Sequence, residues 1–514
     1  MPLHLVWLAA GLVLAANVAR AQEPCSGLII QGTVPEGPET HFFLPFEVPE
    51  GIAEIEVRHD DLSSENILDW GLDDPNGFRG WGGGNREPAV VGVEAASRSY
   101  VPGAMPVGTW EVVVGKAKIV ETPAEYDICI ILRTEPTLPP QPRMPYEDPG
   151  VLDSEARWYA GDFHVHSRQS GDARPTIAET LEVARDVGLD FIMLSEHNTN
   201  SGLTLYGSVQ PDFPNLLIVP GVEWTTYSGH AGGIGATEWV DHKVGVRGAT
   251  VEAAIEAYHD QGALFSPTHP EEPSWEQCIG CEWEFEVDPR AVDGVEVQTG
   301  VWAAIGLWEE YCRLGSHAAA LGGSDDHNAG QVDNPITKPI GTPTTMVFAD
   351  GLSVDAILDG VRNARTVVKV NGIDGPMLET ELSGERVGDT VFADSATLSV
   401  RVTAATDEAL QVIKNGAVVE TLSIDSDPFM HEMSVEAPPE GEDRYRHQVV
   451  RANVPLTVGS YVWLRAADTP EPPEPGESSS GCSCRLVNPA DHDTGVLLAA
   501  LGLCMLYWRR RRVC

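Results

Sequence analysis

Histidine and carboxylate residues of the kinds that bind metal ions are concentrated in the middle of this chain. The series opens with Asp162-Phe163-His164-Val165-His166-Ser167. His164 and His166 are separated by one residue, so on an extended strand both side chains face the same side. As neutral imidazoles they could chelate one cation. A single His-x-His pair is also common on surfaces and in cores, so a metal site needs further ligands elsewhere in the chain.

Further His, Glu and Asp residues follow short apolar runs that are strand candidates. In βα barrels, residues at the carboxyl ends of the strands meet at one mouth. Core packing does not predict that five successive strand ends deliver such residues, whereas a site for Zn, Mn or Fe does. The groups are Glu196-His197 after 191–195, Glu223 after 217–222, His230 within the glycine-rich 228–233, His269 after 264–268, and Asp325 with His327 after 320–324.

The elements that must position these residues alternate between strand and helix from Trp158 to about Thr366. Helical patterns cover 176–187 and 250–261, and Thr176 and Glu179 have the spacing of a capping box. Repeating βα units predict a parallel sheet or barrel.

The segments on either side carry short β-type runs separated by glycine- and proline-rich turns, and each predicts a β-sandwich. The middle segment is bounded by a proline-rich linker before it and by the second set of β-type runs after it. The predicted organisation is a signal peptide over 1–21, an N-terminal β-sandwich over 22–135, a linker over 136–156, the metal-binding segment over 157–369, a C-terminal β-sandwich over 370–467, a linker with a Cys motif over 468–484 and a sorting tail over 485–514.

The motifs of the middle segment resemble, in type and order, those of the PHP (polymerase and histidinol phosphatase) domain superfamily. Within it they look most like the CehA/McbA-type metallohydrolases. The resemblance covers about 157–368 and implies a distorted seven-stranded (β/α) barrel, flanked here by the two β-sandwiches. The matching motifs are His164-x-His166 with Ser167, Ser195-Glu196-His197-Asn198, Glu223 with His230 and His269, and Asp325-x-His327.

This resemblance also implies two or three divalent cations, Zn, Mn or Fe, and a metal-bridged hydroxide that attacks a phosphoester. The sequence departs from the family at Asp172, where many members have His, and at Glu196, where many have Asp. The implied ligands are His164, His166, Glu223 and Asp325 for the first cation, Glu223, His230 and His269 for the second, and Asp172, His197 and His327 for the third. The residues expected to carry catalysis are Glu223, Asp325 and His327.

The charge of the chain limits its partners. There are 77 acidic and 33 basic residues, a formal net charge of −44. Nucleic-acid binding requires a basic surface, and basic residues cluster only at the extreme C-terminus. We therefore expect a small-molecule ester or phosphoester as partner. Two alternatives stay open, a carboxylic or carbamate ester hydrolase of the same fold and a non-catalytic surface binding protein.

Both ends of the chain indicate export. Residues 5–16 are apolar and precede Ala19-Arg20-Ala21, the small-x-small pattern of a signal-peptide cleavage site. Residues 496–508 are apolar but fewer than the roughly 20 that span a bilayer, and 509–512 are all arginine. With Cys482 and Cys484, this end resembles the C-terminal sorting tails of myxobacterial surface proteins. We expect a cell-surface or extracellular protein that contacts the membrane only through this tail.

The remaining cysteines have several possible roles in an exported protein. Cys25 and Cys129 bracket the first β-rich segment and could form a disulfide. Cys278 and Cys281 could form a tight disulfide, remain free thiols or supply half of a metal site. Cys312 falls on a helical pattern and is expected in the core. Trp275 and Trp283 could line the pocket or cover the barrel, and the second is expected. The side chains of His242, Lys243 and Arg247 could contact an anionic substrate group, but a solvated face is expected.

Overall fold

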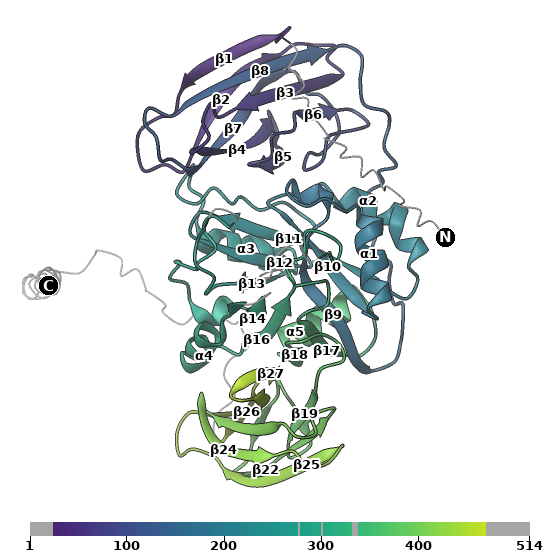
Figure 1. The fold of residues 1–514 in the computed structure, drawn as a ribbon, viewed down its shortest axis with the longest axis vertical. Helices are drawn as coiled ribbons and strands as arrows, with labels where there is room; N and C mark the ends of the chain where they lie inside the picture. Colours follow the sequence, from purple (N-terminus) through teal and green to yellow (C-terminus); the bar gives the residue numbers. More distant parts are fainter. Residues whose placement is uncertain (1–23, 276–277, 300–301, 332–337, 469–514) are drawn as a thin grey trace, which may run out of the picture. The chain divides into compact units, whose positions relative to one another are not determined.

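The computed structural model describes residues 24–275, 278–299, 302–331 and 338–468, which form a mixed α/β structure rich in sheet (Figure 1). The predicted signal peptide (1–21) and sorting tail (485–514) lie outside the described residues, as does nearly all of the linker over 468–484. Within the described part of the chain, no helix is both long and apolar enough to cross a membrane.

The N-terminal segment consists of two four-stranded antiparallel sheets. Their strand orders are β1-β8-β3-β6 and β2-β7-β4-β5, and alternate side chains from both sheets form one buried core around Trp110 and Ile55. A disulfide joins Cys25 to Cys129 on β8. The strands are β1 (Leu28–Thr33), β2 (His41–Val48), β3 (Glu54–Asp60), β4 (Ile67–Asp74), β5 (Gly77–Gly83), β6 (Ala89–Gly92), β7 (Gly108–Lys118) and β8 (Glu125–Arg133).

Ten strands and five α-helices make up the described part of the middle segment. The strands are β9 (Arg157–Val165), β10 (Phe191–His197), β11 (Leu217–Thr226), β12 (Gly229–Ile234), β13 (Leu264–Thr268), β14 (Gly294–Thr299), β15 (Trp302–Ala303), β16 (Ala319–Gly323), β17 (Thr344–Ala349) and β18 (Thr366–Lys369). The α-helices are α1 (Ile177–Asp186), α2 (Leu203–Val209), α3 (Val251–Asp260), α4 (Ile305–Arg313) and α5 (Val354–Arg362).

The strands of this segment are only partly parallel, and a closed seven-stranded barrel is not shown. β9, β10 and β11 are parallel, but β12 is antiparallel to both β11 and β13, and β17 is antiparallel to β9. β15, β14 and β16 form a separate three-stranded sheet. An isolated parallel bridge between Val165 and Asp326 links the end of β9 to the residues after β16. The expectation of regular βα repeats is therefore wrong at β11 and β12, which form a hairpin, and the α3 helix comes only between β12 and β13.

The two helices predicted from the sequence are present as α1 and α3. At α1, the Thr176 hydroxyl accepts a hydrogen bond from the Glu179 N–H, and the Glu179 carboxylate accepts one from the Thr176 N–H, so the predicted capping box is confirmed. The α3 helix buries Val251, Ala254, Ile255 and Tyr258, whose spacing places them on one face.

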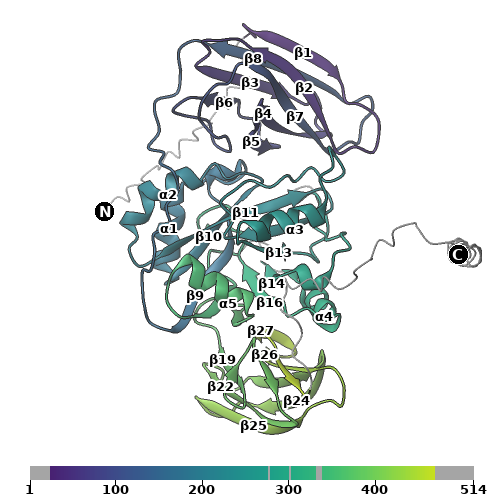
Figure 2. The same ribbon diagram turned by 180° about the vertical axis from the view of Figure 1, so that it is seen from behind.

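The C-terminal segment continues the main sheet of the middle segment. β18 pairs with β27, and the sheet then runs through β26, β23 and β24. Figure 2 shows β27, β26 and β24 within the C-terminal segment. A second sheet has the order β20-β19-β22-β25. The strands are β19 (Met377–Leu382), β20 (Glu385–Arg386), β21 (Thr390–Phe392), β22 (Ser395–Thr403), β23 (Ala409–Lys414), β24 (Ala417–Ser423), β25 (Phe429–Glu436), β26 (Asp443–Arg451), β27 (Val454–Gly459) and β28 (Val462–Arg465).

Candidate metal centre

The His-x-His pair, His164 and His166, lies at the end of β9 and is completely buried. The two Nε2 atoms are 3.1 Å apart, so both imidazoles point to the same place. The Oδ1 atom of Asp325 lies 3.2 Å from the Nε2 atom of His164 and 3.0 Å from that of His166. Asp325 has a φ of 56°, a left-handed conformation that turns the chain just after β16. Two strand ends thus bring three predicted ligands together.

Glu223 lies on β11 at the centre of the cluster and has no exposed surface. Its Oε1 atom lies 3.1 Å from the Nδ1 atom of His230 and 3.0 Å from the Nε2 atom of His269. Its Oε2 atom lies 2.7 Å from the Nδ1 atom of His197, and 3.4 and 3.5 Å from the Nε2 atoms of the His-x-His pair. One carboxylate therefore contacts five imidazoles, the arrangement expected of a group that bridges two cations.

Asp172, the residue at which the sequence departs from the PHP pattern, also reaches the cluster. Its Oδ2 atom lies 3.1 Å from the Nε2 atom of His197 and 3.3 Å from that of His327. Gly171, with a φ of 95°, redirects the chain just before it. The rings of His197 and His327 also stack with the His166 ring, with centroids 4.5 and 4.1 Å away. The three residues predicted for a third cation are therefore adjacent to the first group.

The hairpin formed by β11 and β12 explains how His230 reaches the same edge as the other ligands. His230 lies at the start of β12 and not after a strand, contrary to the pattern read from the sequence. Because β12 runs antiparallel to β11 and β13, its first residues lie beside the carboxyl ends of both neighbours. His230 pairs with Thr225 on one side and Thr268 on the other, and His269 directly follows β13.

Glu296 on β14 is a buried carboxylate of the site that the sequence analysis did not identify. Its Oε1 atom lies 3.1 Å from the Nδ1 atom of His164, and its Oε2 atom accepts a hydrogen bond from the His269 N–H at 3.1 Å. A carboxylate on Nδ1 holds the proton there and leaves the Nε2 lone pair of His164 free for a cation. In the sequence, Glu296 could have been recognised only as one acidic residue inside the apolar run Val295-Glu296-Val297.

Replacing Glu296 with Gln is expected to weaken metal binding by about 10–100-fold, the usual effect of losing such a supporting carboxylate. The amide can donate to the Nδ1 atom of His164, which favours the tautomer with its proton on Nε2 and removes the ligand lone pair. Titration with a divalent cation measures this affinity. Glu436→Gln, an exposed position on β25, is the matched control. Equal affinities in Glu296→Gln and the wild-type protein would contradict the assigned role.

Burial and charge act in opposite directions on the groups of the cluster. Burial lowers the pKa of His164, but the carboxylates of Glu296, Glu223 and Asp325 outweigh it and hold that pKa well above its usual value. For Glu223, burial raises the pKa, and the imidazoles of His164 and His197 nevertheless hold it well below the usual value. The Glu223 carboxylate is thus ionised inside the cluster, where divalent cations would also supply the positive charge that stabilises it.

The donor set fits divalent cations in two further respects. The Nδ1 atom of His269 is buried and has no hydrogen-bond partner among the described residues. Buried polar atoms without partners are uncommon in folded proteins and often mark a site for an ion. Potential ligand atoms also lie within 4.8 Å of one another in two groups of three residues, His164/His166/Glu223 and His166/His197/His327. Imidazoles and carboxylates are the usual ligands of first-row divalent metals.

A cavity of about 620 Å³ opens onto this cluster. Its lining includes Asp172, His197, Asp325 and His327, and the N-terminal segment contributes Asp69, Trp81 and Asn85. The Tyr227 hydroxyl, on the loop between β11 and β12, donates to the Oδ2 atom of Asp69 at 2.7 Å and connects the two segments. The apolar lining includes Ile67, Trp275, Ile279 and Trp302.

Three expectations for residues around the centre were wrong. Trp275 lines the cavity, whereas Trp283 is partly buried and packs with Phe285 against the core, as expected. His242 and Lys243 are 2% and 4% exposed and not solvated, because the ring of Trp81 from the N-terminal segment lies 4.6 Å from the His242 ring.

Asp326 directly follows the predicted ligand Asp325, but its carboxylate points away from the cluster. Its oxygens accept hydrogen bonds from the Asn328 and Gly330 N–H groups. Glu196 likewise faces the loop behind the site, where it accepts hydrogen bonds from the N–H and hydroxyl of Ser167. These hydrogen bonds hold the loops that carry the ligands, and none of them is made to a predicted ligand.

No protein-family model matches this chain, and no curated protein is similar to it. Sixteen chains of solved structures match it. One is a two-domain protein from Bacteroides vulgatus described as containing a predicted PHP-like metal-dependent phosphoesterase, with a TM-score of 0.33 and 19% identity over 62% of this chain and 99% of that one. Another is the CARDB domain of a Pyrococcus furiosus protein in complex with di-metal ions, with a TM-score of 0.14 and 14% identity over 19% of this chain and 97% of that one. At TM-scores this low, neither similarity bears on function, and the function must be argued from the side chains themselves.

Proposed function

We propose that this protein is a metal-dependent hydrolase that cleaves phosphoesters, of the PHP type that its motifs resemble. The observation that carries the proposal is the Glu223 carboxylate, which is completely buried and contacts five imidazoles beneath a cavity of about 620 Å³. Clustered ligands at the floor of a cavity are the usual setting for metal-assisted hydrolysis.

The chain supplies ligands for two or three cations that share Glu223 and the residues around it. Bound divalent cations lower the pKa of a coordinated water so that it can attack at neutral pH, and they neutralise charge on the ester oxygens. The first cation would be held by His164, His166, Glu223 and Asp325, the second by Glu223, His230 and His269, and the third by Asp172, His197 and His327.

Residues of this chain also prepare the site before a substrate enters. The Nδ1 atom of His327 lies 2.9 Å from the backbone carbonyl of Asp325, which accepts a hydrogen bond from the Nδ1–H group, so Nε2 is the atom presented to Asp172 and the cavity. Glu272 lines the cavity and is nearly buried, and burial raises its pKa. A carboxyl group with a raised pKa can give a proton to the leaving oxygen of the ester.

A second candidate function is hydrolysis of carboxylic or carbamate esters. Part of the cavity wall is formed by Trp81, Trp275 and Ile279, which suit an apolar or aromatic ester better than a highly charged one. The same ligands and the same water would serve both reactions, because each develops negative charge on oxygen in the transition state.

An assay of the full-length chain loaded with Mn²⁺ or Zn²⁺ tests these proposals. The expected result is hydrolysis of an aryl phosphate that falls at least 100-fold in the double variant Asp325→Asn, His327→Asn, since this variant removes ligands of two cations. Cleavage of an aryl acetate or carbamate, but not of the phosphate, would favour the second candidate. If the wild-type protein cleaves none of the three faster than the double variant, the hydrolase proposal is wrong.

A further inference from the structure

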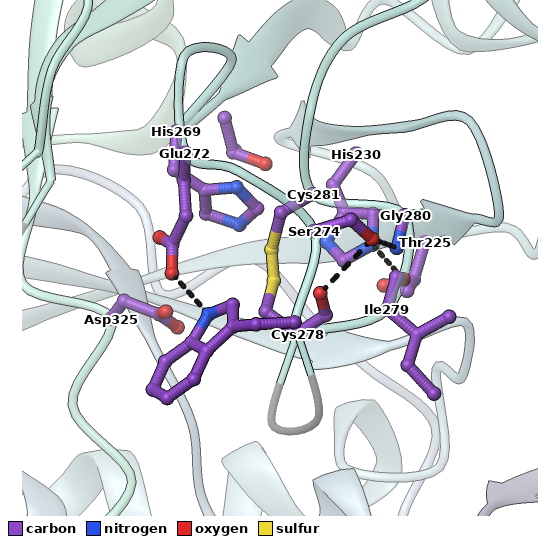
Figure 3. Close-up of a disulfide and its surroundings, with 12 residues drawn as sticks. Thr225, His230, His269, Glu272, Ser274, Cys278, Ile279, Gly280, Cys281 and Asp325 are labelled. Carbon is purple, nitrogen blue, oxygen red and sulfur yellow. Dashed lines mark hydrogen bonds between the residues drawn. A yellow bond between two sulfur atoms is a disulfide. The ribbon is translucent and has the colours of Figure 1, made fainter. Parts of the chain in front are cut away.

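The disulfide between Cys278 and Cys281 lies in the wall of the cavity, beside the second group of predicted ligands (Figure 3). Cys281 is completely buried, whereas Cys278 is partly exposed and lines the cavity. The Nε2 atom of His230 lies 3.3 Å from the backbone carbonyl of Ile279, between the two cysteines. The two cysteines and the histidines of the second group, His230 and His269, each place one ligand atom within 4.8 Å of the others.

The backbone around the cysteines is held by contacts that do not depend on the bond between the sulfurs. The N–H groups of Trp275 and Cys278 each donate to the other residue's carbonyl, at 2.9 and 3.2 Å. The Gly280 N–H donates to the Ser274 hydroxyl at 2.7 Å. Gly280 has a φ of 81°, and a Cβ there would lie 2.5 Å from the Thr226 carbonyl, so the loop fits closely against β11. The cysteines are therefore expected to keep their positions when the disulfide is opened.

Four such side chains form a recognised ligand set once both sulfurs are thiolates. Two cysteines separated by two residues, together with two histidines, make up the Cys₂His₂ set of tetrahedral zinc sites. Thiolates also favour Zn²⁺ over the harder divalent ions. The Nδ1 atom of His269 is buried and has no hydrogen-bond partner in the described part of the chain, which leaves a ligand atom available. In the disulfide form the sulfurs cannot act as thiolates, and both histidines contact Glu223.

We propose that Cys278, Cys281, His230 and His269 form a zinc site that exists only after the disulfide is reduced. A dithiol reductant gives two electrons and two protons to the disulfide bond and itself becomes a disulfide. When Zn²⁺ binds, the two thiols release their protons to solvent. This site shares His230 and His269 with the second cation of the proposed hydrolase, so the two sites compete. The competition, but not the zinc site itself, rests on the proposed function.

Cobalt substitution of the full-length chain tests the site directly. The reduced protein is freed of dithiol by anaerobic desalting and then titrated with Co²⁺. The expected result is a sulfur-to-cobalt charge-transfer band in the near ultraviolet whose intensity at saturation corresponds to one thiolate-bound Co²⁺ per chain and that is lacking in the oxidised protein. If the masses of alkylated peptides show that Cys278 and Cys281 are reduced but Co²⁺ gives no such band, the proposal is overturned.

The double variant Cys278→Ser, Cys281→Ser is the control, because it retains the Cys25–Cys129 disulfide and the buried free Cys312. It is expected to give no band. A band of wild-type intensity in this variant would assign the signal to other cysteines and overturn the proposal.

Cysteine alkylation of the reduced wild-type protein tests the site without a variant, so the result does not depend on whether a variant folds. Zn²⁺ is expected to slow alkylation of Cys278 and Cys281 at least tenfold, read from the mass of their peptide, without slowing that of Cys312. Equal alkylation with and without Zn²⁺ would contradict the site.

Glu223→Gln separates this inference from the proposed function. Gln removes the carboxylate shared by the hydrolase cations but leaves the four proposed zinc ligands in place. The reduced Glu223→Gln protein is therefore expected to show the charge-transfer band at wild-type intensity. Cation binding by the oxidised wild-type protein without a band after reduction would overturn the zinc site alone. A band after reduction without cation binding by the oxidised protein would support the zinc site and count against the hydrolase.

Discussion

Replacing Glu223 with Gln is expected to lower the rate of ester hydrolysis by about 1000-fold, equivalent to about 4 kcal/mol of transition-state stabilisation. Both carboxylate oxygens contact imidazoles that are predicted ligands, and Glu223 has no exposed surface. The Gln amide keeps one acceptor oxygen, but an NH₂ donor replaces the other oxygen and the negative charge is lost. A cation shared between the first and second groups would lose the ligand that joins them.

Steady-state rates with the aryl phosphate substrate measure this effect. Glu238→Gln is the matched control, because Glu238 is an exposed residue of the same segment that lies outside the cavity lining. It is expected to leave the rate within twofold of wild type. A Glu223→Gln protein that stays folded and retains more than a tenth of the wild-type rate would argue against a bridging role.

Replacing Asp162 with Ala is expected to lower the free energy of unfolding by about 3–6 kcal/mol, since an unpaired buried donor costs about 1–3 kcal/mol. Asp162 on β9 is completely buried. Its Oδ1 atom accepts hydrogen bonds from the His164 and Ser324 N–H groups at 3.1 and 3.0 Å, and its Oδ2 atom accepts one from the Gly341 N–H at 2.8 Å. This one carboxylate ties β9 to the residue after β16 and to the loop before β17.

Denaturant unfolding followed by tryptophan fluorescence measures this loss. Asp162→Asn is the closest comparison, because its amide retains one oxygen that accepts from two of the three donors. It is expected to lose less stability than the Ala variant. A loss below about 1 kcal/mol in Asp162→Ala would mean that water or local rearrangement satisfies all three donors, against the assigned role.

Much of the candidate centre could be predicted from the sequence because its ligands interrupt apolar runs. His164, His166, His269 and Asp325 lie at the ends of strands or directly after them, where a polar residue stands out. Glu296 could not be found this way, because it lies inside a buried strand and appears as one irregular position in an apolar run. Its role depends on the Nδ1 atom of His164, 132 residues earlier in the chain.

The sequence did not predict the direction of β12, because the glycine-rich run 228–233 does not by itself identify a hairpin. Gly229, with a φ of 141°, belongs to the tight turn between β11 and β12. The glycines around His230 fit such a hairpin turn as well as they fit a loop after a strand. Regular βα repeats were expected, and a hairpin at this point prevents them.

The burial of His242 and Lys243 depends on contacts that no local pattern contains. The ring of His41 lies 5.6 Å from that of His242, and the two residues are about 200 positions apart in the sequence. A loop of polar residues is predicted to be exposed to solvent unless the segment that covers it is known. The same limit applies to the cavity, because Asp69 and Trp81 reach it from the N-terminal segment.

Metal content of the full-length chain is the most direct test of the central claim, that the cluster around Glu223 is a multinuclear metal centre. The oxidised protein is loaded with Mn²⁺ or Zn²⁺, desalted and analysed by inductively coupled plasma mass spectrometry. The expected result is two or three cations per wild-type chain and at most one in Glu223→Gln. Fewer than one cation per wild-type chain after loading with either metal would contradict the account.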